Sequence, residues 1–468
     1  MNDARGLTDA GSYRDPAGHV YYLDGRVLRT VAERAASDYE YIRDRGLLTR
    51  WVNAGWLVES NEIDPSVLGT ANGKPRYVLE HAKIPFVSYP YEWPFSALKA
   101  AALLHLDLQL AAFDESVVFS DASAYNVQFV GPRPVFIDVL SFRRYQAGEF
   151  WTGHRQFCEQ FLNPLLLRSL FGVPHNAWYR GNLEGISTED LCCVVPLSRR
   201  LSWKIFAHVI LLGRLQKSAI KKQRVEDMAK LRQRKFPPAA YRGVLSQLRK
   251  WIAGIGPRGM TLTIWADYDR THTYATEEET AKRNFVGDFV AQAKPKTVWD
   301  LGCNTGEYSE VALKAGAERV IGFDFDQGAL EKAFSRAEAK RLNLLPLFLD
   351  AANPTPDQGW NSNERKSLTA RQNADAVLAL AFEHHLAIGR NVPLNHVVSW
   401  IVSLARRGII EFVPKSDATV QKMLALRSDI FDDYTEESFK CALASQARIL
   451  KVQTVSATGR RLYAFERD

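Results

Sequence analysis

The chain has 468 residues, and at this length a single hydrophobic core is expected to divide into two or three domains. Hydrophobic residues make up 46% of the sequence, as in ordinary globular proteins, and no apolar stretch reaches the ~20 residues that span a bilayer. The formal net charge is +7, but it is concentrated in residues 214–250, which hold twelve lysine and arginine residues against two acidic ones. These values argue against an integral membrane protein and against a uniformly basic surface.

The N-terminal residues and the cysteines indicate the cellular compartment of the protein. The N-terminal residues lack the basic-then-apolar pattern of a signal peptide. The five cysteines are scattered, without the spacing of a zinc site. We therefore expect a cytoplasmic protein with reduced thiols and no metal site.

The first hundred residues predict an α+β arrangement. Residues 19–28 alternate in polarity around Asp24-Gly25, which predicts a β-hairpin. A helix is expected over 32–56, a strand over 77–80 and an apolar helix over 95–113.

Three polar residues follow that helix in a distinctive order. Four residues separate Asp121 from Asn126, and Asp138 ends the next apolar strand. Kinase-type phosphotransferases place a base Asp, a metal-binding Asn and a metal-binding Asp in this order. The N-terminal half is therefore similar to kinase and aminoglycoside-phosphotransferase folds, which implies a phosphotransfer site that binds Mg-ATP.

The phosphotransferase pattern is incomplete. No His-Arg precedes Asp121, no Phe-Gly follows Asp138, and no glycine-rich phosphate loop is present. Arg26, Arg29 or Lys83 would have to replace the usual strand lysine. A degenerate fold that docks substrate or the second domain is the alternative.

The basic run at residues 214–250 has two interpretations. It can form a surface for nucleic acid or acidic lipid, or a solvated helix between domains. We favour the helix, because no aromatic residues suited to base stacking accompany the charge. Pro237-Pro238 and nearby glycines then mark a linker. We expect an accessory domain at 1–210, a basic helical linker at 211–258 and a catalytic domain at 259–468.

The last segment predicts a doubly wound α/β sheet. Seven strands are expected, with helices between them and a closing antiparallel hairpin, at residues 297–300, 319–324, 344–350, 374–382, 408–413, 447–455 and 461–465. Aromatic residues at 265–274 and a long loop with Trp360, Glu364, Arg365 and Arg371 are expected to form lids over a substrate pocket.

The ends of the first two strands of this sheet indicate the ligand. The first strand runs into Asp300-Leu301-Gly302-Cys303-Asn304-Thr305-Gly306, and the second ends at Asp324. A dinucleotide site needs G-x-G-x-x-G and a P-loop needs Gly-Lys-Ser/Thr, and both patterns are absent here. Acids beside a turn with two glycines suit a cationic ligand without phosphate.

This pattern resembles class I S-adenosylmethionine-dependent methyltransferases. The resemblance implies that Asp300 and the turn residues Gly302, Cys303, Asn304 and Gly306 bind the methionine end and that Asp324 binds the ribose. Asp350 would meet the adenine amino group or be an exposed strand-end acid, and Phe325 would stack on adenine or pack in the core.

Glu383-His384-His385 follow the fourth strand and are the candidates for a catalytic base. Methyl transfer from a sulfonium needs mainly alignment, but a hydroxyl or amine acceptor must also lose a proton. One of the histidines, or Glu383, could accept it, and the sequence does not say which. One histidine could instead only cap the next helix.

Several strings resemble the family of bacterial methyltransferases related to the rhizobial nodulation protein NoeA. They are Leu79-Glu80-His81, Tyr89-Pro90-Tyr91-Glu92-Trp93-Pro94-Phe95, Phe136-Ile137-Asp138, His384-His385 and Glu411-Phe412-Val413-Pro414. The resemblance implies a methyltransferase acting on a saccharide or other small molecule. Nucleic acid is not the expected partner, because the basic run lacks aromatic interleaving for base stacking. A scaffold with degenerate nucleotide sites, or a bifunctional kinase–methyltransferase, is the alternative.

Overall fold

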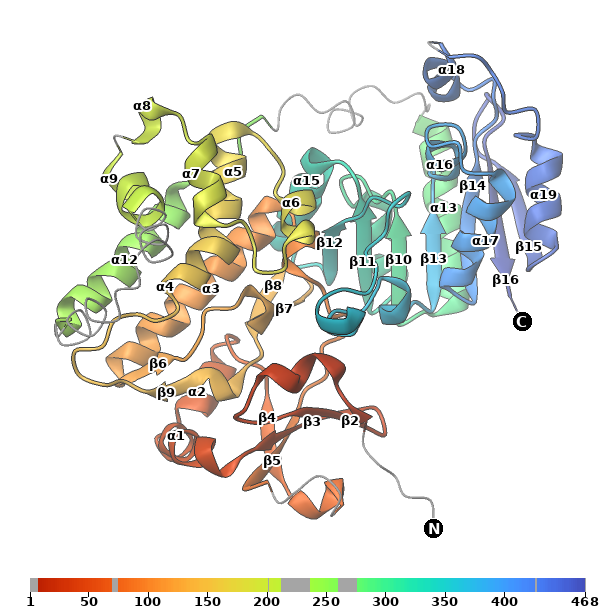
Figure 1. The fold of residues 1–468 in the computed structure, drawn as a ribbon. Coiled ribbons are helices and arrows are strands. Elements are labelled where there is room, and N and C mark those ends of the chain that lie inside the picture. The colour runs from red at the N-terminus through yellow and green to blue at the C-terminus, as the bar shows by residue number, and fades with distance from the viewer. Residues whose placement is uncertain are drawn as a thin grey trace.

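The computed structural model describes residues 7–69, 75–200, 202–211, 236–259, 276–425 and 427–467. Figure 1 shows a small sheet and a helical region from the N-terminal half beside a larger sheet from the C-terminal half. One continuous cluster of buried apolar residues runs through both halves. None of the described helices is both long enough and apolar enough to cross a membrane.

The N-terminal sheet is antiparallel, with the strand order β1-β2-β3-β5-β4. Its strands are β1 (Leu7–Thr8), β2 (Val20–Leu23), β3 (Arg26–Val31), β4 (Ser60–Ile63) and β5 (Tyr77–His81). The predicted hairpin is confirmed, and Asp24 and Gly25 both have positive φ, as the tightest hairpin turns require. The predicted helix over 32–56 is two helices, α1 (Glu33–Asp44) and α2 (Leu47–Asn53), because Gly46 has a left-handed φ of 69°.

A long buried helix is followed by a strand pair that encloses a hairpin. They are α3 (Phe95–Asp114), the paired strands β6 (Val117–Phe119) and β9 (Phe142–Arg144), and the paired strands β7 (Val127–Val130) and β8 (Arg133–Phe136). The helical region consists of α4 (His154–Phe157), η7 (Cys158–Leu162), α5 (Asn163–Phe171), α6 (Asn176–Gly181), α7 (Thr188–Val194), α8 (Leu197–Arg200), α9 (Trp203–Ile205) and η8 (Phe206–Ile210). The segments η7 and η8 are π-helical turns.

The described part of the basic run packs on the N-terminal unit. Helix α12 (Pro238–Gly254) buries Tyr241, Leu245, Leu248 and Ile252, and it lies against α3. Its arginines face outward in ion pairs, such as that of Arg242 with Asp114. The earlier part of the run, 214–235, lies outside the described residues, as do the aromatic residues at 265–274. The interpretation of the run as a solvated helix between domains therefore stays a prediction.

The C-terminal sheet confirms the predicted seven strands, in the order β12-β11-β10-β13-β14-β16-β15. They are β10 (Thr297–Leu301), β11 (Arg319–Asp324), β12 (Leu344–Phe348), β13 (Ala376–Ala379), β14 (Arg407–Phe412), β15 (Arg448–Thr454) and β16 (Arg461–Glu466). The first five are parallel and β16 is antiparallel to both neighbours. Strand β13 is shorter than predicted, because Ala381 has a φ of 49° and ends the extended conformation.

Helices cover both faces of this sheet (Figure 1). They are α13 (Thr276–Ala293), α14 (Glu307–Lys314), α15 (Gln327–Lys340), α17 (Leu394–Leu404) and α19 (Glu436–Ala444), while α16 (Glu383–Ala387) and α18 (Ala418–Leu424) lie toward the carboxyl ends of the strands (Figure 1). Alternate strand residues face opposite sides, so Val298 packs with α13 while its neighbour Trp299 packs in the core shared with the N-terminal unit. Phe86 from that unit meets Trp299, with ring centroids 5.8 Å apart.

A buried ion pair joins the two units where β12 and β13 are connected by a loop. Arg371, in the 3₁₀ turn η12 (Thr369–Arg371), donates to Glu92 of η4 (Pro90–Glu92) at 2.5 and 2.9 Å. Both side chains are about 5% exposed, and Thr355 also donates to Glu92. This contact fixes the loop against the N-terminal unit.

The same loop does not form the expected lid. Glu364 accepts from Arg14 at 2.7 Å, and the guanidinium of Arg365 lies 4.1 Å from the ring centroid of Tyr125. Trp360 is exposed, and neither it nor the loop's charged residues line the cavity described below. The prediction of a lid is therefore wrong for this loop. The loop instead contacts the N-terminal unit, and its length allows it to reach that unit.

Candidate functional site

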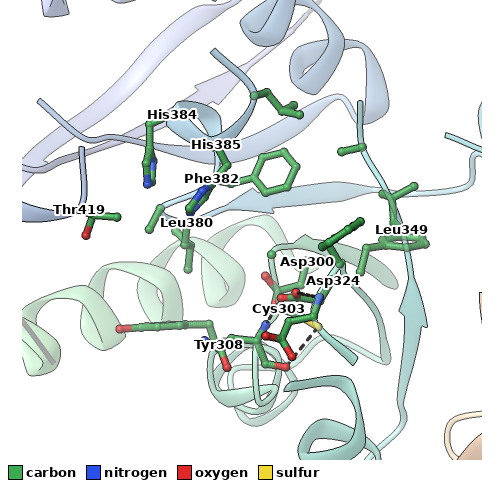
Figure 2. A pocket seen from close by; sticks show the side chains of 18 of the residues that line it. Asp300, Cys303, Tyr308, Asp324, Leu349, Leu380, Phe382, His384, His385 and Thr419 are labelled. Atoms are coloured by element: carbon green, nitrogen blue, oxygen red, sulfur yellow. Dashed lines mark hydrogen bonds between the residues drawn. The ribbon is translucent and has the colours of Figure 1, made fainter. Parts of the chain in front are cut away.

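A cavity of about 380 Å³ opens at the carboxyl ends of β10, β11 and β13. Open parallel sheets bind ligands at this position, where the strand order reverses. Of the residues predicted to bind the cofactor, Gly306 alone does not line this cavity. The residues that do are Asp300, Gly302, Cys303, Asn304, Asp324, Phe325 and Asp350. Figure 2 shows Asp300, Cys303 and Asp324 on one side and the two histidines with Thr419 on the other.

The turn after β10 brings backbone close to the cavity. Gly302 and Gly306 have φ of 71° and 79°, a region that glycine enters without strain. A Cβ on Gly302 would lie 3.1 Å from the ring of Phe382, and one on Gly306 would lie 2.8 Å from Leu344. Gly306 caps α14 and so acts behind the cavity wall.

Asp300 is a buried acid at the end of β10. It is 1% exposed, and it accepts a hydrogen bond from the Ser309 hydroxyl at 2.6 Å. Burial raises the pKa of Asp300 to about 7, and the nearby charge of Asp324 adds to this rise. A cation that enters the cavity would offset the free-energy cost of burying the charged carboxylate, because an opposite charge favours the ionised form.

Asp324 holds the glycine turn against the end of β11. Its two carboxylate oxygens accept from the amides of Asn304 and Asp326, each at 2.8 Å. Burial raises the pKa of Asp324 to about 6, against the lowering effect of these amides. Each oxygen keeps a further lone pair, so the carboxylate can still accept two hydroxyl groups.

The outer end of the cavity carries the predicted adenine contacts. Phe325 is 57% exposed, and its ring lies 5.6 Å from that of Phe348. A core role for Phe325 is therefore excluded. Asp350 lies at the rim, 3.8 Å from the guanidinium of Arg390.

The candidate bases Glu383, His384 and His385 differ in their position relative to the cavity. His384 and His385 line the cavity, with ring centroids 4.1 Å apart, whereas Glu383 does not line it. Glu383 is fully buried, and its Oε1 accepts from the Val413 amide at 2.9 Å and from the Tyr434 hydroxyl at 2.7 Å. The other oxygen lies 3.5 Å from Nδ1 of His384.

The ring nitrogens of the two histidines also differ. Nε2 of His384 is buried without a hydrogen-bond partner among the described residues. Burial lowers the pKa of His385 to about 3, and the adjacent His384 lowers it further. His384 therefore presents an unused ring nitrogen at the cavity and is oriented through its other nitrogen by a buried carboxylate.

Two buried ion pairs beside the histidines were not predicted. Lys282 donates to Glu411 at 2.6 Å, and Arg460 donates to Asp417 at 2.7 Å. Lys282 and Arg460 line the cavity together with Tyr308 and Thr419. These partners lie far apart in sequence on different elements, so no local pattern connects them.

The predicted phosphotransfer residues also come together, in the N-terminal unit. The amide of Asn126 donates to Asp121 at 3.1 Å. Asp138 lies 3.0 Å from the guanidinium of Arg29, which comes from β3 and also pairs with Asp15. Burial raises the pKa of Asp121 to about 7, and Asp138 raises it further.

Methyltransferases are among the known proteins that the C-terminal half is similar to. Residues 281–375 match the FtsJ-like methyltransferase family. A shorter segment is 42% identical over 64 residues to the ribosomal protein L11 methyltransferase of Photobacterium profundum, covering 14% of this chain and 22% of that protein. The magnesium protoporphyrin IX methyltransferase of Synechocystis, solved with bound SAH, is 20% identical, with a TM-score of 0.30 over 41% of this chain and 86% of its own.

A relative over the full length is the nodulation protein NoeA of Rhizobium meliloti. It is 48% identical over 459 residues, which make up 98% of this chain and 96% of that protein. The chain therefore belongs to the NoeA family of nodulation proteins, and its C-terminal unit is a methyltransferase domain of the S-adenosylmethionine-dependent class.

Proposed function

We propose that the chain transfers a methyl group from S-adenosylmethionine to a hydroxyl or amine of a small-molecule or saccharide acceptor. The observation that carries this proposal is the pair of buried acids, Asp300 and Asp324, at adjacent strand ends beside a turn with two left-handed glycines. This arrangement repels phosphate and favours a cation. A cavity of this size takes one small ligand and a reacting group.

The residues of the cavity fit the cofactor in their chemistry. Asp300 and the buried, unpartnered Oδ1 of Asn304 offer acceptors to an ammonium group. Asp324 offers lone pairs to two ribose hydroxyls, and the exposed ring of Phe325 offers a face to adenine. When bound, S-adenosylmethionine supplies a sulfonium methyl that is already activated for displacement.

His384 is the general base in this proposal, and Glu383 is its positioning residue. In the tautomer with its proton on Nδ1, His384 donates toward the carboxylate of Glu383, which leaves Nε2 to accept the proton of the acceptor. Glu383 is itself held by Val413 and Tyr434, so the imidazole has a fixed orientation. The proposal thus selects His384 among the three residues that the sequence left open.

The cofactor affinity is expected to depend on pH through Asp300. Its pKa is raised to about 7 in the free protein, and an ammonium group binds best when the carboxylate is charged. Affinity should therefore fall by about tenfold per pH unit as pH drops below about 7. Calorimetric titration with S-adenosylmethionine between pH 5.5 and 7 measures this slope.

Asp300→Asn is the matched variant for this pH series. The substitution keeps the volume of the side chain but removes its titration, so the remaining slope should come from Asp324 and begin only near pH 6. A wild-type affinity that stays constant from pH 7 to pH 5.5 would contradict the role of Asp300 as the ammonium partner.

A second candidate function concerns the N-terminal unit. Asp121, Asn126 and Asp138 gather near Arg29, which comes from β3, the strand that supplies the phosphate-binding lysine in protein kinases. We propose that this cluster binds a magnesium–nucleotide complex, with Arg29 moving from Asp138 to the phosphates. Burial and, to a smaller extent, the neighbouring Asp138 raise the pKa of Asp121, and a divalent cation would favour the charged form of both acids.

Asp138→Asn is expected to abolish magnesium-dependent binding of ATP by the full chain, because it removes one anionic metal ligand. Fluorescence titration with a labelled ATP analogue, with and without magnesium, measures this effect. If the wild-type chain binds no nucleotide while it still binds S-adenosylmethionine, the N-terminal unit serves only to support the methyltransferase domain.

All five cysteines of the chain are free in the structure. Free thiols persist in reducing compartments, which supports a cytoplasmic location as part of this proposal.

A further inference from the structure

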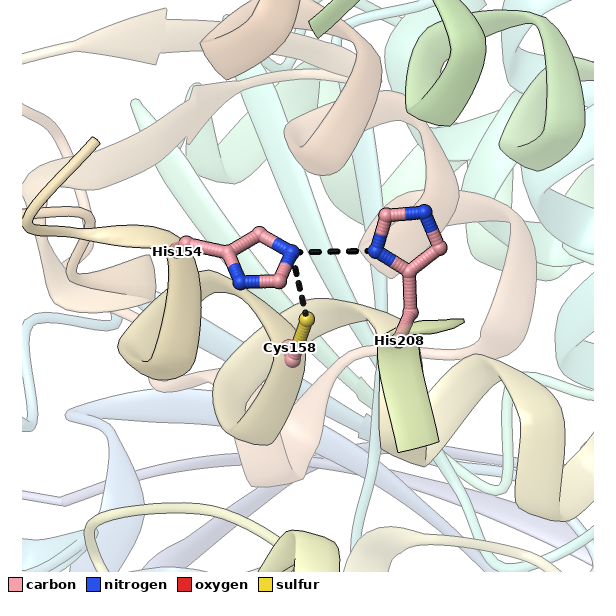
Figure 3. Close-up of side chains that lie close together, drawn as sticks. All are labelled: His154, Cys158 and His208. Carbon is pink, nitrogen blue, oxygen red and sulfur yellow. Dashed lines mark hydrogen bonds between the residues drawn. The ribbon is translucent and has the colours of Figure 1, made fainter. Parts of the chain in front are cut away.

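Two histidines and a cysteine meet inside the helical region of the N-terminal unit. Figure 3 shows His154 and Cys158 on one helical segment facing His208 on another. Nε2 of His154 lies 3.0 Å from Nδ1 of His208 and 3.7 Å from the sulfur of Cys158. These three ligand atoms all lie within 4.8 Å of one another. Cys158 and His208 are buried, and His154 is partly exposed.

These distances match the edges of a tetrahedral zinc site. Zinc bonds of about 2.0–2.1 Å to nitrogen and about 2.3 Å to sulfur put ligand atoms about 3.3 Å (N to N) and about 3.6 Å (N to S) apart. The two separations in the structure differ from these values by only a few tenths of an ångström. The third separation, between the sulfur of Cys158 and the ring of His208, is within 4.8 Å, so one ion can contact all three atoms after small rotations of these side chains.

The types of ligand select the metal. Imidazole nitrogen and thiolate sulfur suit zinc and similar transition metals, whereas magnesium and calcium require oxygen ligands. The described residues add no carboxylate to this group of three. A fourth position would be filled by water, which can approach from the side where His154 is exposed.

The local backbone supports the same conclusion. His154 and Cys158 are four residues apart, so they lie on one face of α4 and the start of η7. His208 lies in the second π-helical turn, η8, 54 residues after His154. Single π-helical turns occur frequently at functional sites, and here both helical segments that carry the ligands contain one.

We propose that His154, Cys158 and His208 bind one zinc ion that ties α4 and η7 to η8. The sequence predicts no metal site, because its cysteines have no zinc spacing and His208 is distant in sequence. Without metal, the same atoms can form a hydrogen-bonded group, in which the Cys158 thiol and one imidazole donate. The two arrangements differ in metal content and in the response of stability to zinc.

Elemental analysis of the untagged full-length chain, dialysed against zinc and then against metal-free buffer, tests the proposal. We expect about one zinc ion per chain, and a melting temperature that rises with the concentration of free zinc. Cobalt substitution should give a thiolate-to-metal absorption band. Cys158→Ser should remove this band, and His208→Asn should reduce the zinc content to near zero.

Cys192→Ser is the matched control, because Cys192 lies in α7 of the same unit outside the cluster. It should keep both the zinc ion and the absorption band. Binding of S-adenosylmethionine shows independently that each variant is folded. A wild-type chain that retains no more zinc than the Cys158→Ser and His208→Asn variants would overturn the proposal and leave the hydrogen-bonded group.

Discussion

Replacing His384 with asparagine is expected to lower kcat by about 10²- to 10⁴-fold, the range that a positioned general base contributes. The asparagine amide can still donate to Glu383, so the buried carboxylate keeps a partner, but the ring nitrogen proposed to accept the proton is lost. Cofactor affinity should change little, because the base acts on the acceptor. Transfer of labelled methyl from S-adenosylmethionine to a small-molecule extract measures the rate, and calorimetry measures the affinity.

Two further variants distinguish the roles of Glu383 and His385 from that of His384. Glu383→Gln removes the carboxylate beside Nδ1 of His384, so kcat should fall while the affinity for S-adenosylmethionine stays unchanged. A purely structural role for Glu383 would instead lower the cofactor affinity together with kcat. His385→Asn should have a much smaller effect than His384→Asn. The reverse order would reassign the base to His385.

Arg371→Ala is expected to destabilise the folded chain by about 3–5 kcal/mol, because it leaves the buried carboxylate of Glu92 without its counter-charge. Arg371 also donates to the Val87 carbonyl at 2.7 Å, and its guanidinium lies over the rings of Phe86 and Tyr89. The substitution therefore removes contacts between the two units as well as charge. Chemical denaturation followed by tryptophan fluorescence measures the change in unfolding free energy.

Arg242→Ala provides the control for this measurement. Arg242 pairs with Asp114, and both side chains are about half exposed, so its loss should cost less than about 1 kcal/mol. Combining Arg371→Met with Glu92→Leu should restore much of the lost stability, since it removes both charges together. If Arg371→Ala costs no more than Arg242→Ala, the buried pair does not hold the units together.

The C-terminal sheet was predictable because its signals are local. Each parallel strand is a short apolar run, and the acids that end β10 and β11 follow directly in sequence. Asp300 and Asp324 could therefore be assigned to one edge of the sheet from the order of the residues alone. The errors lay where the backbone leaves regular geometry, as at Gly46, which divides the predicted helix 32–56, and at Ala381, which shortens β13.

Contacts between distant segments could not be predicted. Glu92 and Arg371 are 279 residues apart, and each looks like an ordinary surface charge in its own sequence context. His208 likewise gives no sign that it meets His154 and Cys158. The different environments of His384 and Glu383 depend on Val413 and Tyr434, which come from the end of β14 and the loop before α19. Such information resides in packing, which periodicity and spacing do not encode.

Calorimetric titration of the full chain with S-adenosylmethionine, repeated with Asp324→Asn, tests the central claim most directly. The wild-type chain should bind with micromolar affinity. The variant should lose about 1–3 kcal/mol, or roughly 5- to 150-fold, because charge-assisted hydrogen bonds to the ribose are weakened. No binding by the folded wild-type chain, or equal affinity in both proteins, would contradict the assignment of this cavity as the cofactor site.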